Sequence, residues 1–600
     1  MANTIVPAEL LQSSGYNIKL GNTAGDSITT GEYNITIGNA AGTAITTGAR
    51  NTGVGRQALT TLTTGDDNTA IGSQALQLMT TASDNTAVGS GALYATTTGA
   101  NNTAVGYSAL VANTTADNNT AVGKDALTAN TTGADNVAIG STALDENTTG
   151  SANTAVGSTA LNSNTTASNN TAVGYGSQAN TTTGTDNVSV GSHSLDANTT
   201  GSDNTAIGDN ALGASTTGSY NTAVGSSALF ENTTASNNTA YGYNAMKDNT
   251  TGAENTAVGR SALDENTTGD YNVALGGGAL GNNTTADSNT ALGYTALFAN
   301  TTGTENVAVG FAALDANTTG NNNAAFGRGS LTDNTTGLNN TGLGDNALAN
   351  NTTASNNTAV GKDALLANTT GASNTSVGHT ASQSITTGSS NTTLGKQAGG
   401  SLTTGDNNIA IGNSAMDHAI NTTTGSQNIM IGDYTDMSAV DGSNQLVIGY
   451  NVTCVGNSNF TFGDGTTDSN IAFGATTITA PSDVRLKEDI QDEEVGLDFI
   501  NELRPVTFRW KKAKDVPPEM KVHDPHSEER VMNGKYNHGF VAQEVKEVID
   551  NYDLKDGFDM WTEDETDGRQ RIGEASLMPL MVKAVQELSA KVEELEDKLK

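Results

Sequence analysis

Ser482 and Lys487 are two residues near the C-terminus whose types could do covalent chemistry. A serine hydroxyl is a weak nucleophile and needs a base that takes its proton. A lysine can be that base when desolvation or a nearby positive charge lowers its pKa, and Arg485 or basic groups of neighbouring subunits would supply the charge. Ser–Lys pairs are a known variant of the serine triad. The spacing alone does not select this pair, because a serine five residues before a lysine is common by chance.

Other residues that carry chemistry are sparse. Cys454 is the single cysteine, which excludes a disulfide framework and a thiolate metal cluster. His523 and His526 lie in a proline-rich loop and lack the spacing of a zinc site. For His538, a packing or hydrogen-bonding role is favoured over a catalytic one. We therefore expect no cofactor and no metal.

Composition and charge narrow the class of protein. Hydrophobic residues make up 35% and aromatic residues 4% of 600, too few for several ordinary globular cores. The net charge of −36 argues against binding to nucleic-acid phosphates and to anionic membranes. No signal peptide is readable, and no apolar run approaches the ~18–20 residues of a membrane span. We expect a soluble chain made in a cytosol, with no nucleic-acid partner and no membrane insertion.

The chain divides into two unequal parts at Pro481. Residues 481–600 hold 18 Lys and Arg and 29 Asp and Glu, or 47 charges in 120 residues. The preceding 480 residues hold the remaining 9 and 34, or 43 charges. Both tryptophans and six of the seven prolines also lie after residue 480. The C-terminal part is therefore predicted to be a small globular domain of normal composition.

The first part is a repeat of 17 residues. An asparagine recurs at every seventeenth position from Asn17 to Asn408, which gives 24 copies over residues 17–412, and a glycine follows each asparagine four residues later. So strict a period means that each copy is one structural unit. Only some 16 residues, 1–16, precede the first copy, and we expect them to be a short attachment or capping segment rather than a large anchoring domain.

Each unit is predicted to be one coil of a β-roll or β-helix. Seventeen residues are too few for two helices, and Asn-Thr-Ala-Val-Gly alternates like a short strand that ends at a turn. The second half, Ala-Leu-x-x-Asn-Thr-Thr-Gly, is expected to form another short strand or a tight bend. Stacking would align Val, Leu and Ala into apolar ladders, and Asn and Thr into ladders that satisfy the turns. The Asn-Thr-Thr motif is accordingly interpreted as structural, although it matches a glycosylation sequon.

The repeats resemble the head domains of trimeric bacterial adhesins, in which Asn-x-x-x-Ile-Gly-type motifs build β-rolls packed as trimers. That resemblance implies a homotrimer, in which packing of three thin rolls would bury a second apolar ladder. The expected fold class is mostly β: a long repetitive shaft of 17-residue coils, followed by a small α+β domain that ends in a helix.

After Gly412 the glycine spacing becomes irregular, and residues 413–480 are interpreted as an irregular β segment at the distal tip. Aromatic residues gather there. Four of them are candidate receptor contacts: Tyr434, Tyr450, Phe460 and Phe462. Exposed positions after the turn glycines are a second set of candidates, because their aromatic rings would suit sugar stacking: Tyr107, Tyr175, Tyr243, Tyr294 and Phe311.

Residues 481–600 resemble the peptidase S74 family, the intramolecular chaperone domain of phage endosialidases, tailspikes and tail fibres. The resemblance is carried, in order, by the Ser-Asp-Val-Arg-Leu-Lys run at 482–487, the Leu-Arg-Pro run at 503–505, the Gly-Phe-Val-Ala-Gln-Glu run at 539–544 and the Leu-Met-Pro run at 577–579. It implies that the chain is cut once, in cis, between Pro481 and Ser482. Ser482 is then the nucleophile and Lys487 the general base. Asp483 and Arg485 either support this pair or form a capped, solvated helix start.

The C-terminal helix, residues 577–600, carries heptad spacing. Apolar residues at 581, 585, 588, 592, 595 and 599 alternate steps of four and three, as in a coiled coil. The seam is shorter than three heptads, so an amphipathic helix lying on its own domain remains the alternative. In the resembled family this helix belongs to a trimer.

These features predict a homotrimeric phage tail fibre that recognises a host surface glycan or protein and attaches to the virion tail directly or through an adaptor protein. The virion is its expected location, with assembly in the host cytoplasm. Three alternatives remain. A capsid or neck fibre would share every feature, a bacterial trimeric adhesin would need a secretion signal and an anchor, and a depolymerase tailspike would need paired carboxylates in a groove.

Overall fold

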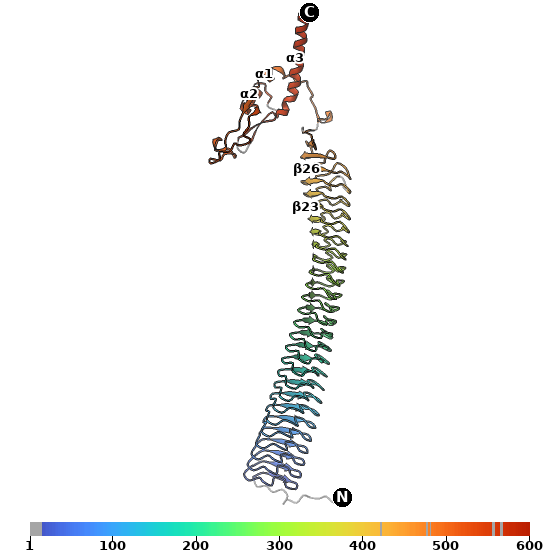
Figure 1. The fold of residues 1–600 in the computed structure, drawn as a ribbon, viewed down its shortest axis with the longest axis vertical. Coiled ribbons are helices and arrows are strands. Elements are labelled where there is room, and N and C mark those ends of the chain that lie inside the picture. Colours follow the sequence, from blue (N-terminus) through green and yellow to red (C-terminus); the bar gives the residue numbers. More distant parts are fainter. Residues whose placement is uncertain (1–14, 420–422, 476–477, 481, 555–557, 565–567) are drawn as a thin grey trace. The chain divides into compact units, whose positions relative to one another are not determined.

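The computed structural model describes residues 15–419, 423–475, 478–480, 482–554, 558–564 and 568–600. The chain forms two compact units, Met1–Pro481 and Ser482–Lys600. The first is a single stack of coils, which Figure 1 shows as one gently curved column. The predicted attachment segment, residues 1–16, lies almost wholly outside the described residues.

Each 17-residue repeat contributes one three-residue strand. The strands are β1 (Ile18–Leu20), β2 (Ile35–Ile37), β3 (Thr52–Val54), β4 (Thr69–Ile71), β5 (Thr86–Val88), β6 (Thr103–Val105), β7 (Thr120–Val122), β8 (Val137–Ile139), β9 (Thr154–Val156), β10 (Thr171–Val173), β11 (Val188–Val190), β12 (Thr205–Ile207), β13 (Thr222–Val224), β14 (Thr239–Tyr241), β15 (Thr256–Val258), β16 (Val273–Leu275), β17 (Thr290–Leu292), β18 (Val307–Val309), β19 (Ala324–Phe326), β20 (Thr341–Leu343), β21 (Thr358–Val360), β22 (Thr375–Val377), β23 (Thr392–Leu394) and β24 (Ile409–Ile411).

Successive strands pair in parallel with a constant shift of one repeat. Val137 of β8 lies opposite Thr154 of β9, and the same relation links every pair from β1 to β24. The rest of each described coil consists of turns and bends without a second strand. The predicted β-solenoid with one coil per repeat is confirmed, and of the two predictions for its second half the bend is correct.

The core of the shaft is a narrow apolar ladder. Side chains alternate across a strand, so the middle residue points inward while the first and third point outward. Ala138 in the middle of β8 is fully buried, as are Ala143 and Leu144 on the following turn. The same three positions are buried in coil after coil and form two long apolar clusters. One alanine pair and one leucine fill a coil this thin, which explains the low hydrophobic content.

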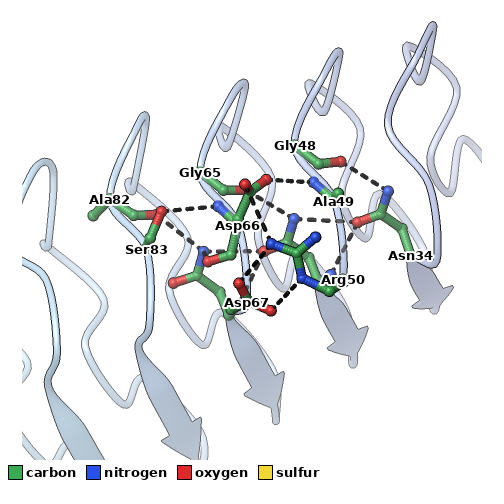
Figure 2. Close-up of polar contacts among 11 residues, drawn as sticks. Asn34, Gly48, Ala49, Arg50, Gly65, Asp66, Asp67, Ala82 and Ser83 are labelled. Atoms are coloured by element: carbon green, nitrogen blue, oxygen red, sulfur yellow. Dashed lines mark hydrogen bonds and ion pairs between the residues drawn. The ribbon is translucent and has the colours of Figure 1, made fainter.

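Buried asparagines satisfy the backbone between coils. Asn136 is fully buried; its Oδ1 accepts the backbone N–H of Asn153 at 3.0 Å and its Nδ2 donates to the Gly150 carbonyl at 2.9 Å. Figure 2 shows the equivalent bond from Asn34 Nδ2 to the Gly48 carbonyl, 2.9 Å long. The repeated asparagine is therefore needed to stack the coils, which is why it keeps its register throughout.

The sequon asparagines form a second buried ladder. Asn147 Nδ2 donates to Asn130 Oδ1 at 2.9 Å and to the Gly150 carbonyl at 3.0 Å, and the side chain is fully buried. Threonines beside them link coils too, because Thr148 Oγ1 donates to the Thr165 carbonyl at 2.9 Å. Both amide hydrogens of Asn147 are used inside the fold, in agreement with the structural interpretation of Asn-Thr-Thr.

The glycine that ends each strand is required by its backbone conformation. Gly140 has a φ of +140°, and a Cβ atom there would lie 2.3 Å from the carbonyl oxygen of Gly157 in the next coil. A side chain would therefore collide with backbone, not with a movable group. This close approach explains why the position is glycine in every copy.

The parallel ladder continues beyond the regular repeats into residues 413–480. It passes through β25 (Ile429–Ile431), β26 (Gln445–Gly449) and β27 (Asn459–Gly463), with shifts of 20, 17 and 14 residues between partners, and ends on β28 (Ser469–Ala472), which pairs antiparallel to β27. The changed glycine spacing thus reflects coils of different length on the same stack.

The C-terminal unit is a small α+β domain. Its elements are η2 (Val484–Leu486), α1 (Leu497–Glu502), β29 (Val506–Phe508), η3 (Ala513–Asp515), β30 (Asn537–Gly539), α2 (Ala542–Asn551), β31 (Trp561–Glu563), β32 (Gln570–Ile572), η4 (Glu574–Leu577) and α3 (Met578–Leu599). Its core gathers around Phe499, which packs among buried residues of α2 and α3 such as Ile549 and Leu580. The predicted small domain with a terminal helix is confirmed.

Candidate functional site

The short helix η2 brings Ser482 and Lys487 together. The chain turns through η2, so the residue before its N-cap and the residue that caps its C-terminus face each other. Lys487 Nζ lies 2.7 Å from Ser482 Oγ and donates a hydrogen bond to it. The two side chains proposed from the sequence as nucleophile and base are therefore within direct proton-transfer distance.

Asp483 and Arg485 stabilise the same turn. Asp483 caps η2, because its Oδ1 accepts the backbone N–H of Arg485 at 2.9 Å. Its carboxylate also pairs with the Arg485 guanidinium, with Nε–Oδ1 at 3.0 Å. The hydrogen bond from the Arg485 side chain holds the pKa of Asp483 below its ordinary value. Neither residue contacts the Ser–Lys pair through any bond found in the described residues, so their role is to fix the turn that carries it.

The Ser–Lys pair is open to solvent within a single chain. Ser482 and Lys487 are both exposed. A lysine acts as a base only when neutral, and loss of hydration is what favours the neutral form. Pro481, which provides the carbonyl of the predicted scissile bond, lies outside the described residues. Chemistry at this pair would thus require burial by a further surface.

His538 lies on strand β30 and not on the turn that carries Ser482 and Lys487. It pairs with Thr507 in the antiparallel ladder of β29 and β30, and its side chain is exposed. Among the described residues, no cluster of three or more His, Cys, Asp or Glu side chains could hold a metal ion. Within that same part of the chain, no helix has the length and apolarity to cross a membrane.

The four receptor candidates at 413–480 separate into two groups. Tyr434 and Tyr450 lie on turns, with ring centroids 5.9 Å apart, and His418 extends the row with its ring 4.7 Å from Tyr434. Phe460 and Phe462 instead lie on β27, opposite Leu446 and Ile448. They continue the outward rows of the sheet. Sequence spacing did not identify His418, because it lies 16 residues before Tyr434 and at a different position of its coil.

The heptad residues of α3 do not pack on their own domain. The buried residues of α3 are Leu580 and Ala584, on a different face. The six seam residues remain 46–87% exposed: Met581, Val585, Leu588, Val592, Leu595 and Leu599. Within the described residues, α3 therefore packs on its own domain through Leu580 and Ala584, while its heptad residues form an exposed apolar stripe. The coiled coil stays a prediction.

A comparison with protein families matches residues 482–554 to the model described as chaperone of endosialidase, peptidase S74. The match begins at Ser482, the first residue of the C-terminal unit. Neither the curated proteins nor the solved structures gave a match to the chain. A chaperone of this family at the C-terminus, together with a long β-solenoid, fits a tailspike or fibre with a C-terminal chaperone domain, and the family implies trimeric assembly.

Proposed function

We propose that the chain is the subunit of a homotrimeric phage tail fibre that recognises a host surface, and that its C-terminal unit is a chaperone released by self-cleavage at the Pro481–Ser482 bond. The observation that carries the proposal is the junction at residue 482. The compact unit that contains the solenoid ends at Pro481, and the family match, the C-terminal unit and the Ser–Lys pair all begin at Ser482.

Two unpartnered apolar rows support the trimer. One is the seam of α3 described above. The other runs along the outward face of the shaft, where aliphatic side chains at the ends of the strands stay exposed, among them Ile139 at 40%, Leu275 at 44% and Leu343 at 48%. Continuous exposed apolar surface on a soluble protein usually marks an interface. Three copies would bury each row at an interface between subunits.

The regularity of the shaft explains why such a trimer needs a chaperone. The 24 coils are nearly identical, so three chains could associate one coil out of step and lose the contacts of a single coil. A C-terminal unit that trimerises first fixes the register before the coils pair. Once the shaft is formed, removal of that unit makes the assembly kinetically irreversible.

The groups at the turn account for each bond and proton in the proposed cleavage. Ser482 Oγ attacks the carbonyl carbon of Pro481 while neutral Lys487 accepts the hydroxyl proton. The C–N bond between the two residues breaks, Lys487 returns the proton to the leaving nitrogen of Ser482, and Pro481 is left as an ester on Oγ. Water then hydrolyses this ester, which yields a Pro481 carboxylate and restores the hydroxyl. No cofactor is needed, and the reaction occurs once per chain.

Mass spectrometry of purified, assembled protein tests the cleavage. We expect separate products of residues 1–481 and 482–600. Ser482→Ala leaves a single chain of 600 residues, and so does Lys487→Arg, which keeps the charge and the donor but removes a usable base. Ser527→Ala in the same unit is the matched control and cleaves normally. A shortened product from Ser482→Ala would refute the assignment.

The location and the recognition role need a separate test. Antibody against the shaft, visualised by immunogold labelling of virions, should mark the tail, whereas labelling of the capsid or neck would move the fibre there. Purified fibre should bind host cells and compete with virion adsorption. For receptor contact we favour the half-buried ring of Tyr434 and the exposed ring of Tyr450 over Phe460 and Phe462, because the phenylalanines lie on the outward rows that the trimer would cover.

A further inference from the structure

One register position on the shaft repeats a pattern of three residue types. The residue after the buried leucine is Asp196, Gly213 and Phe230 in three consecutive coils, and four coils later the same position is Asp264, Gly281 and Phe298. In both sets a coil without a side chain lies between a carboxylate and an aromatic ring. Stacked coils are ~4.8 Å apart, so the backbones that carry the carboxylate and the ring lie roughly 10 Å apart, and the glycine between them leaves space into which the ring tilts.

The second set forms a notch of about 400 Å³. Its floor is the glycine coil, and Phe298 leans over it: a Cβ atom at Gly281 would lie 2.8 Å from Phe298 Cε2. Tyr294 covers Gly277 in the same way, at 3.4 Å from a Cβ atom there to Tyr294 Cδ2. Arg260 and Asp264 line the opposite wall. The notch thus has an aromatic wall, a backbone floor and a charged wall.

The first set forms a second notch of about 300 Å³ with the same plan. Phe230 leans over Gly213, where a Cβ atom would lie 2.9 Å from Phe230 Cε2. Asp196 stands on the other side with His193, whose Nδ1 lies 3.4 Å from Asp196 Oδ2. Two notches with the same three residue types at the same register position indicate a repeated site and not an accident of one coil.

The chemistry of the notches suits a neutral sugar. Tyr294 and Phe298 are 54% and 40% exposed, and an aromatic face attracts the C–H groups of a pyranose ring. Asp264 places a carboxylate beside these rings, and its buried Oδ1 has no hydrogen-bond partner within the described residues. Burial, followed by the charge of Asp248, raises the pKa of this carboxyl, although a hydrogen bond from Ser261 acts in the opposite direction. Aspartates at both sites and a net charge of −36 oppose an anionic ligand.

Exposed rings also recur along the shaft with the spacing of the notches. Tyr107, Tyr175, Tyr243 and Phe311 are each 68 residues apart, which is four coils of 17, and all four are more than half exposed. Four coils span roughly 19 Å. A ligand that is itself periodic is the natural partner of a periodic strip, since each added unit meets the same contacts again.

We propose that the turn face of the shaft between residues 175 and 311 is a binding strip for a neutral polysaccharide, with one sugar unit seated in each notch between Asp and Phe. The inference rests on the proposed function, because it names what the fibre would recognise on a host. The strip lies on turns after the strands, so it is separate from the outward strand rows assigned to the trimer. Occupation of both notches by one polymer adds avidity.

Variants that fill the notches or remove their aromatic rings test the proposal in the full-length protein. Gly213→Thr and Gly281→Thr each fill a notch with a residue that other coils carry at this position. Phe230→Leu combined with Phe298→Leu removes both rings, and leucine occupies the same position at residue 366. Asn162→Thr is the matched control, because it places threonine at the same register position outside the notches. Circular dichroism and the melting temperature verify that each variant is folded.

The probes are purified neutral bacterial O-chain polysaccharides and acidic capsular polysaccharides on one array, together with the bacteria from which they were taken. We expect the wild type to bind a neutral polysaccharide, with about 3- to 10-fold weaker binding for each single notch variant. A variant that combines Gly213→Thr with Gly281→Thr, and the double phenylalanine variant, should each lose about 30-fold or more, because avidity is lost as well. Asn162→Thr should bind like the wild type.

Other outcomes separate the two proposals. If the wild type binds the bacteria and the notch variants bind equally well, or if only acidic polysaccharides are bound, the strip is refuted while host recognition stands. If the wild type binds neither the polysaccharides nor the bacteria, host recognition by this chain fails and the strip fails with it.

Discussion

Replacing Asn153 by alanine tests whether the buried amide ladder holds the coils together. Asn153 Oδ1 accepts the backbone N–H of Asn170 at 3.0 Å, and its Nδ2 donates to the Ala167 carbonyl at 2.9 Å and to Asn136 Oδ1 at 3.2 Å. After truncation, Ala167 keeps a donor from Asn164 Nδ2, and Asn136 Oδ1 keeps the backbone N–H of residue 153. The Asn170 N–H alone loses its acceptor.

The expected magnitude follows from that inventory. One buried donor left without an acceptor costs about 1–3 kcal/mol, and each of the two other lost bonds costs about 0.5–1.5 kcal/mol. The free energy of opening this part of the shaft should therefore fall by about 2–6 kcal/mol. A value of about 3 kcal/mol, in the lower half of this range, corresponds to opening that is roughly 100-fold more frequent.

Hydrogen exchange measured by mass spectrometry on the full-length protein reports this opening locally. Amides of residues 153–170 should exchange roughly 100-fold faster in Asn153→Ala, with little change in distant coils, since each coil contacts only its neighbours. Asn162→Thr in the same coil is the control and should change the opening free energy by less than about 0.5 kcal/mol. Exchange within threefold of the wild type in Asn153→Ala would show that the strand ladder and the leucine core suffice without the amide.

Two further outcomes are expected. Leu588→Glu places a charge in the α3 seam and should convert the trimer to a monomer, as measured by light scattering. The control Gln586→Glu lies off the seam and should leave the trimer intact. A trimer that survives Leu588→Glu would show that the coiled coil does not hold the assembly together. Hydrogen bonds, first from the Thr466 hydroxyl and then from backbone amides, lower the pKa of Asp464 to about 2. Their stabilisation of this loop is complete above the ordinary value of 3.8 and is lost as the pH falls through about 2. Hydrogen exchange of the loop, corrected for intrinsic rates, should begin to accelerate as the pH falls below 3.8 and should continue to do so down to about pH 2. Acceleration near pH 5 would contradict this.

The period of the shaft was readable because every coil uses the same backbone contacts. The asparagine and glycine found at 136 and 140 recur in each copy. The asparagine hydrogen-bonds to the next coil, and the glycine position has no room for a side chain. The course of the second half was not decided by sequence, because Ala143 and Leu144 are compatible with a strand or a bend. Leu144 adopts a φ of +56°, which no propensity rule assigns to leucine. Stacking on neighbouring coils imposes it.

At the candidate cleavage site, the family resemblance selected Ser482 and Lys487, and spacing did not. The sequence could not predict that Phe460 and Tyr450 lie on different faces of the stack. The coil length changes after residue 412, and the face on which each ring lies changes with it. The row of exposed rings was readable, because the spacing of Tyr107, Tyr175 and Tyr243 is visible in the sequence. That glycine leaves a cavity between Asp264 and Phe298 appears only when three coils are stacked.

The sequence by itself determined a thin, 24-coil β shaft joined to a charged globular domain, since a strict 17-residue period and a composition this poor in large apolar residues permit little else. The tertiary structure decided which apolar residues are left over. It buries Ala138 and Leu144 within one chain and leaves Ile139 and the α3 seam exposed. The physical reason is geometric: a strand alternates its faces residue by residue, but only the path of the coil determines which face closes on itself and which remains for a partner.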